Sequence, residues 1–138
     1  MSLDSIMAAL AVVEATISGI RKAYSKAPPS LNAWPCFVNF PDTADIERAT
    51  NLRKPTHHIK VLLFVLKGAV LPEAEAELRP YLDSTLNAFD GHVTLGGTAG
   101  NSRITGYKYG ILEYAGVPFL GISFDLDVTE WTTVTYVA

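Results

Sequence analysis

The amino-acid sequence predicts a small α+β domain, in which a mainly antiparallel sheet carries an N-terminal helix and a second packed helix and ends in a long C-terminal β-hairpin. Three observations indicate this class. Apolar residues recur at helical spacing in Leu3–Tyr24 and in Leu71–Phe89. His57–Lys67 is an apolar run of strand length. Ile104–Val128 reads as two strands around a short turn that contains glycine. Residues 1–138 contain no linker-like stretch, so we expect one domain.

The first predicted element is a helix from Leu3 to Tyr24. Ser2 suits the N-cap position, and Pro28 with Pro29 prevents the helix from continuing. The spacing also suits a coiled coil, but so short an alanine-rich segment favours a helix that lies on a sheet. The apolar stripe that predicts it consists of Leu3, Ile6, Leu10, Val13, Ile17, Ile20 and Tyr24.

Ala33–Phe40 is predicted as a strand, and Pro35 restricts it to an edge or to the start of pairing. Cys36 is the only cysteine, so it forms no intramolecular disulfide, and we interpret it as a small buried apolar side chain. Pro41–Thr56 follows as the most charged segment. We expect it to be an exposed loop between antiparallel strands or to contain a short helix around Ala44–Ala49.

His57–Lys67 is predicted as the central strand because both of its faces are apolar. Helices would cover one face, and a second layer or another subunit would cover the other. His57 and His58 are adjacent and therefore point to opposite faces, which does not suit a metal site. With His92 as the only other histidine, we expect no metal site and no cofactor.

Leu71–Phe89 is predicted as the second helix, which Pro80 should kink or split. Gly91 suits the position after its C-terminus. Gly91–Arg103 is predicted as a flexible connection. Its glycines do not form a phosphate-binding loop, because the Gly-Lys-Ser/Thr ending is missing.

The late hairpin is the clearest element. Its second strand alternates between a core face and a polar face, and the core face carries Leu120, Ile122, Phe124, Leu126 and Val128. Residues 129–138 are predicted either as a C-terminal arm that docks on a neighbouring subunit or as an ordinary edge strand. Trp131 and Tyr136 are large side chains to leave bare in that segment.

Composition indicates a protein that assembles. Only 18% of residues are charged, against about 25% in typical soluble domains, and the mean hydropathy is +0.20. This favours apolar surface that contacts other chains, although a well-packed monomer with a polar coat is the alternative. The net charge of −3 gives no electrostatic reason for general nucleic-acid binding. No apolar run approaches the about 20 residues of a membrane-spanning helix. We therefore expect a homo-oligomer with neither a membrane nor a sequence-specific nucleic acid as partner.

Catalytic motifs are absent. The sequence has no Gly-x-Ser-x-Gly elbow, His-Glu-x-x-His pair, Walker loop, dinucleotide glycine fingerprint or Cys-x-x-Cys pair. Asp125 and Asp127 share the polar face of one strand, where solubility accounts for them more simply than a cation site. We expect no enzyme, and hence no catalytic, cofactor-binding or metal residues.

The order of helix, strand, charged segment, long central strand, helix and late hairpin resembles the tail-terminator and tail-completion proteins of long-tailed bacteriophages, including the minor tail proteins of lambda-like phages. The resemblance covers Leu3–Val128, and its most specific pieces are WPCFVNF and YKYGILEYAGVPFLGISFDLDV. It implies a non-enzymatic virion protein of the tail or neck, assembled in the host cytoplasm. Such a protein forms a ring, usually a hexamer, at the end of the tail tube, stops tube polymerisation and joins the tail to the head.

The partners that this resemblance implies are further copies of the chain, the tail tube protein and the head–tail connector protein. A ring repeats one heterologous contact, so each protomer needs two complementary surfaces. We expect the second face of the central strand and the hairpin to supply contacts between protomers. The candidate partner contacts are Arg48, Arg53, Lys54, Trp131 and Tyr136.

The alternative class is a ferredoxin-like protein that binds a small ligand or serves as an enzyme subunit, acting as a dimer. In that class Tyr107, Tyr109, His57 or His58 would line a pocket.

Overall fold

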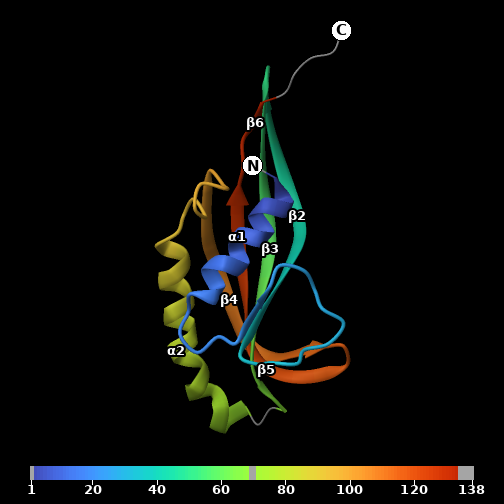
Figure 1. The fold of residues 1–138 in the computed structure, drawn as a ribbon, viewed down its shortest axis with the longest axis vertical. Coiled ribbons are helices and arrows are strands. Elements are labelled where there is room, and N and C mark those ends of the chain that lie inside the picture. Colours follow the sequence, from blue (N-terminus) through green and yellow to red (C-terminus); the bar gives the residue numbers. More distant parts are fainter. Residues whose placement is uncertain (1, 69–70, 134–138) are drawn as a thin grey trace.

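The computed structural model describes residues 2–68 and 71–133, and it has the predicted α+β architecture. One sheet has the strand order β1-β2-β3-β5-β4, with β6 paired onto β3 (Figure 1). All pairings are antiparallel except that of β1 with β2. In chain order the elements are α1 (Leu3–Ala15), β1 (Lys22–Tyr24), β2 (Cys36–Ala49), β3 (Leu52–Lys67), α2 (Leu71–Asp90), β4 (Asn101–Tyr114), β5 (Val117–Thr129) and β6 (Thr132–Thr133).

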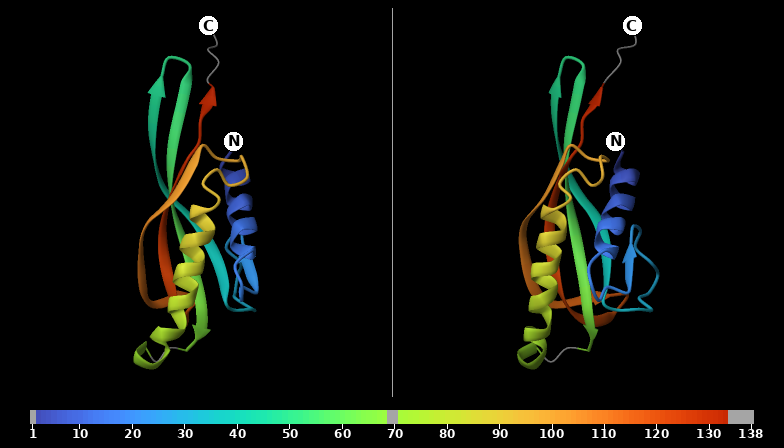
Figure 2. Two further views of the ribbon diagram at one scale, coloured as in Figure 1. Left: turned by 90° about the vertical axis from the view of Figure 1, so that its left-hand side faces the viewer. Right: turned by 60° about the vertical axis from the view of Figure 1, so that its left-hand side comes forward.

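Both helices cover the same face of the sheet (Figure 2). The main core lies between them and the sheet, and the five residues predicted for the core face of β5 are all buried there. The late hairpin is therefore confirmed, with Ala115 and Gly116 as its two-residue turn. Other members of this core are Ile6, Leu10, Val13, Phe37, Val61, Leu63, Leu78 and Phe89.

A second, smaller core covers the opposite face at one end of the sheet. Phe64 of β3 packs edge-to-face against Phe119, with ring centroids 5.4 Å apart, and against Tyr114 at 5.6 Å. Trp34, from the segment before β2, stacks edge-on against Phe119. Because Phe64 is fully buried within one chain, the prediction that this face of the central strand contacts another subunit is wrong at this end of the sheet. Cys36 is buried in the same core, as predicted, and burial raises the pKa of its thiol to about 11.

The first helix is shorter than predicted. Ser2 caps α1 in a reciprocal hydrogen-bonded arrangement with Ser5, as expected, but the helix ends at Ala15 rather than at Tyr24. The chain then turns, with Gly19 at a φ of 87°, and enters β1. Ile17 and Ile20 still contact the main core, but they do so from the turn. The helical spacing of apolar residues therefore extends to Tyr24, although the helix itself ends at Ala15.

The second helix runs from Leu71 to Asp90 and is not split at Pro80. The segment after it differs from the predicted flexible connection. Leu95 and Ala99 are buried in the main core, and the amides of Gly97 and Ala99 both donate to the Thr94 carbonyl at 3.0 Å. This connection is a packed, hydrogen-bonded turn.

The charged segment Pro41–Thr56 is neither a loop nor a helix. Strands β2 and β3 continue through it, with a register shift between Pro41 and Thr43, as far as the pair Ala49 and Leu52, and a turn at 50–51 joins them. We name residues 46–55 the arm, because they extend beyond the end of β5 and project past both helices (Figure 2). Pro41–Ala49 is exposed throughout. Since neither face of this part of β2 packs on the domain, the segment has no alternating apolar pattern by which a strand is predicted.

Candidate interaction site on the projecting arm

The arm is a two-stranded ribbon with little support from the domain. An isolated hairpin is marginally stable in water. Among the described residues, the C-terminal segment helps to hold this one: β6 pairs with Leu52 and Arg53 of β3, and the Glu130 amide donates to the Pro55 carbonyl at 3.0 Å. The arm thus carries ordered backbone away from the core. Residues 46–52 are exposed, whereas Arg53 and Lys54 are half-buried and Pro55 is buried.

Positive charge gathers on the arm. Arg48 lies directly opposite Arg53 in the strand register, and Lys54 lies opposite Glu47. Like charges that face each other across a hairpin destabilise it. Within residues 2–68 and 71–133, no salt bridge neutralises either guanidinium. The unpaired pair of arginines suits an anionic surface, whose binding would offset their mutual repulsion.

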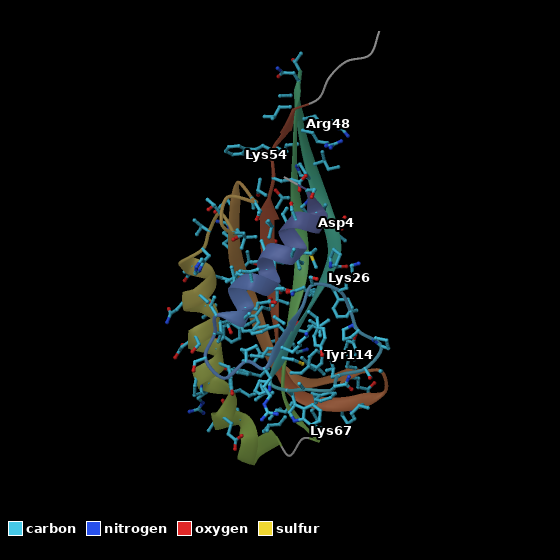
Figure 3. All side chains as sticks on the ribbon, viewed as in Figure 1. Asp4, Lys26, Arg48, Lys54, Lys67 and Tyr114 are labelled. Atoms are coloured by element: carbon cyan, nitrogen blue, oxygen red, sulfur yellow. The ribbon has the colours of Figure 1, made fainter. Side chains whose placement is uncertain are left out.

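Apolar side chains lie among these charges. Ile46 is 51% exposed, Leu52 37% and Trp131 54%. The Lys54 ammonium lies 5.9 Å from the centroid of the Trp131 ring, within cation–π range. Figure 3 shows Arg48 and Lys54 on the same projecting end of the molecule. Because successive strand residues point to opposite faces, Ile46 shares one face of the arm with Arg48 and Arg53, and Leu52 shares the other face with Lys54. Each face thus combines an exposed apolar side chain with positive charge, which suits binding to another protein.

Four of the five candidate contacts are therefore brought together: Arg48, Arg53, Lys54 and Trp131. The fifth, Tyr136, lies outside the described residues. Sequence reasoning missed Ile46 and Leu52. The signal available was the polar pair Thr50-Asn51 between them, because asparagine is common in tight turns.

The base of the arm is tied to the sheet by His58. Its Nδ1 lies 2.7 Å from Asp127 Oδ1 on β5, and its Nε2 lies 2.8 Å from Asp45 Oδ2 on β2. Since ionised carboxylates only accept hydrogen bonds, both ring nitrogens must donate, and the ring is an imidazolium. The hydrogen bond to Asp45, followed by that to Asp127, raises the pKa of His58 above its ordinary value. His57 instead pairs with Glu130 at 3.2 Å.

The outer face beside His58 has a hollow of about 310 Å³. Besides Asp42, its lining contains two carboxylates that are engaged by neighbouring bases, because Lys60 pairs with Asp125 and His58 pairs with Asp127. Among the described residues, no three His, Cys, Asp or Glu side chains are grouped to hold a metal ion. Asp125 and Asp127 thus serve cross-strand ion pairs.

The residues named for a ligand pocket are not brought together. Tyr107 and Tyr109 stack edge-on with ring centroids 5.6 Å apart, and Tyr107 also contacts Phe124 of the main core. They belong to the helix-covered face, whereas His58 lines the hollow on the outer face, which contains neither tyrosine.

Comparison with known proteins adds no relative: no protein-family model and no curated protein matches this chain. In the described part of the chain, neither helix is long and apolar enough to cross a membrane.

Proposed function

We propose that this protein is a non-enzymatic structural component of a bacteriophage tail, forming a ring, expected to be a hexamer, at the end of the tail tube. There it would stop tube polymerisation and join the tail to the head connector, in the neck of a virion assembled in the host cytoplasm. The observation that carries the proposal is the arm. Ordering a backbone costs about 1–2 kcal/mol per residue, and the side chains of Ile46–Ala49 are all exposed in the described part of the chain, so their burial offsets little of that cost.

The division of surfaces also supports the proposal. The two cores are closed within one chain, so folding does not need the arm's side chains. The arm carries exposed Ile46 and Leu52 together with Arg48 and Arg53, which form no salt bridge within residues 2–68 and 71–133. A tail terminator needs such a separation, because it must fold first and then bind tube, connector and neighbouring copies. The tail tube protein, the connector and neighbouring copies of the chain are thus the proposed partners of the arm.

The test compares three variants in an assay of tube length. Arg53→Glu reverses a charge on the arm and should leave the fold intact while abolishing capping of polymerising tubes. Leu120→Asp places a carboxylate in the main core, where Leu120 is fully buried, and should prevent folding. Lys26→Glu reverses a charge at an exposed position between β1 and β2, outside both the arm and the hairpin, and serves as the matched control, which should cap normally.

Circular dichroism reports folding, and electron microscopy reports the length of tubes grown from purified tube protein. Wild-type protein that leaves tube length unchanged would overturn the proposed function. Loss of folding in Arg53→Glu equal to that in Leu120→Asp would overturn the separation between the arm and the core.

A further inference from the structure

Helix α1 exposes a face without charge. Glu14 is the only charged residue between Ser5 and Ile20, and it is buried. The solvent side of the helix instead presents alanine side chains and Val12, which is 68% exposed. A helix that is apolar all round is normally covered on all sides. The solvent face of α1 therefore has the composition of an interface.

A groove runs beside this face. It lies between α1 and the packed turn after α2, and has a volume of about 420 Å³. Its lining includes Ala8, Ala9, Val12, Leu95 and Thr98, and it contains no Asp, Glu, Lys or Arg. Val93, from the same turn, is 46% exposed. The groove thus offers an uncharged, mainly apolar seat for an apolar side chain.

The border of the groove is acidic. Asp4 precedes the lining residue Ser5 on α1, and Asp90, the last residue of α2, precedes the lining residue His92 by two positions. Both carboxylate-bearing residues are exposed. An uncharged groove is therefore bordered by negative charge.

The arm has the complementary pattern. On one face the exposed Ile46 lies beside Arg48 and Arg53, and on the other face the exposed Leu52 lies beside Lys54. We propose that the arm of one copy docks in the α1 groove of a second copy of this chain. Apolar centres would meet inside the contact, and the basic and acidic borders would pair around it.

The occupant must be another copy, because the arm projects away from the helices of its own chain (Figure 2). The part of β2 beyond Asp45 extends for roughly 13 Å, at about 3.3 Å per residue. That exceeds the about 10–12 Å diameter of a helix, so an arm can lie across α1. The contact is heterologous, since it joins two different surfaces, and its repetition generates a closed ring if the rotation closes. This inference rests on the proposed ring and specifies the contact between its subunits.

The decisive experiment mixes two defective variants. Val12→Glu places a charge in the groove, and Ile46→Glu places one on the arm; both sites are exposed, so both variants should fold. Each variant alone should stay monomeric. An equimolar mixture should form 1:1 dimers and stop there, because the intact arm of the first variant fits the intact groove of the second. Ala27→Glu, at an exposed apolar site between β1 and β2, is the matched control and should assemble as wild type.

Light scattering and native mass spectrometry measure these states. Wild-type protein that is monomeric at all concentrations, single variants that assemble normally, or a mixture that remains monomeric would each overturn the inference. The experiments test the proposed function and the groove contact independently. Wild-type protein that caps tubes while Val12→Glu still assembles refutes only the groove contact, and protein that assembles through the groove without changing tube length refutes only capping.

Cross-linking gives an independent reading of the same contact. Val12→Cys and Ile46→Cys variants, mixed and treated with a short bismaleimide, should yield a cross-linked dimer that neither variant yields alone. The natural thiol does not compete, because Cys36 is fully buried. Equal cross-linking in the mixture and in the separate variants would overturn the assignment of these two surfaces.

Discussion

Replacing Glu14 with glutamine is expected to remove a strong pH dependence of folding. Glu14 on α1 is fully buried, and its Oε1 accepts a hydrogen bond from Asn39 Nδ2 at 2.7 Å. Two atoms of this pair, Glu14 Oε2 and Asn39 Oδ1, have no hydrogen-bond partner among the described residues. A protonated Glu14 supplies the donor that an ionised carboxylate lacks. Burial outweighs the opposing hydrogen bond from Asn39 and raises the pKa of Glu14 from 4.5 to about 8.

The sign and size of the pH effect on stability follow from the linkage between proton binding and folding. The folded state keeps the Glu14 proton at pH values where the unfolded chain has released it, so stability is greatest below pH 4.5 and falls until about pH 8. At about 1.4 kcal/mol for each pKa unit, the full loss is about 5 kcal/mol, of which about 3 kcal/mol has occurred by pH 7. Glutamine carries a permanent amide donor in place of the proton. Glu14→Gln should therefore be more stable than wild type at neutral pH.

Urea unfolding at several pH values between 4.5 and 8 measures this effect. The free energy of unfolding of wild type should decline across the window more steeply than that of Glu14→Gln, and the gap between the two should widen with pH. Glu113→Gln, at an exposed position on β4, is the control and should follow wild type. Parallel curves for wild type and Glu14→Gln would refute a neutral buried carboxyl group.

Two further predictions concern a close approach and the base of the arm. Gly121→Ala should lower the free energy of unfolding in urea by about 3 kcal/mol or more, because a Cβ there would lie 2.0 Å from the Leu63 carbonyl oxygen. Gly110→Ala is the control, because a Cβ there would have nothing within 4 Å. Equal stability of the two variants would contradict the close packing at Gly121. Asp45→Asn should lower the pKa of His58, followed by NMR of its ring protons. The stabilising contribution of the imidazolium is complete below the ordinary pKa of 6.5 and is lost as pH rises through the raised pKa. Hydrogen exchange in the arm should therefore quicken in that pH range. An unchanged His58 titration in Asp45→Asn would contradict the role of the His58–Asp45 hydrogen bond.

Sequence patterns correctly predicted strands with one buried face. They missed strands that are exposed and segments that are held by contacts distant in the sequence. The alternation ending at Val128 reports a strand with one covered face, and it placed the late hairpin correctly. Spacing alone could not show that Ile17 reaches the core from a turn. The arm escaped prediction because no core imposes a period on its side chains.

The candidate site was recognised in part for the same reason. Charge marked Arg48 and Arg53 without reference to the fold. The contact between Lys54 of the arm and Trp131 depends on the pairing of β6 with β3, which are about 80 residues apart in the chain. No local sequence pattern indicates such a pairing. The exposure of Val12 was equally hidden, because an apolar helical residue is expected to face the core.

The position of β3 between β2 and β5 also affects how the chain folds during its synthesis. It pairs with β2 through a local turn, but its other neighbour is β5, with Lys67 opposite Phe119 and Thr56 opposite Thr129, pairs that are 52 and 73 positions apart. At a synthesis rate of about 5–20 residues per second, the hairpin of β2 and β3 leaves the ribosome several seconds before β5 exists. Throughout that interval the apolar edge of β3 is unpaired, and it will accept a strand from any nascent neighbour. Crowded translation of this chain therefore favours strand exchange between molecules, and slow dilute synthesis favours the native sheet.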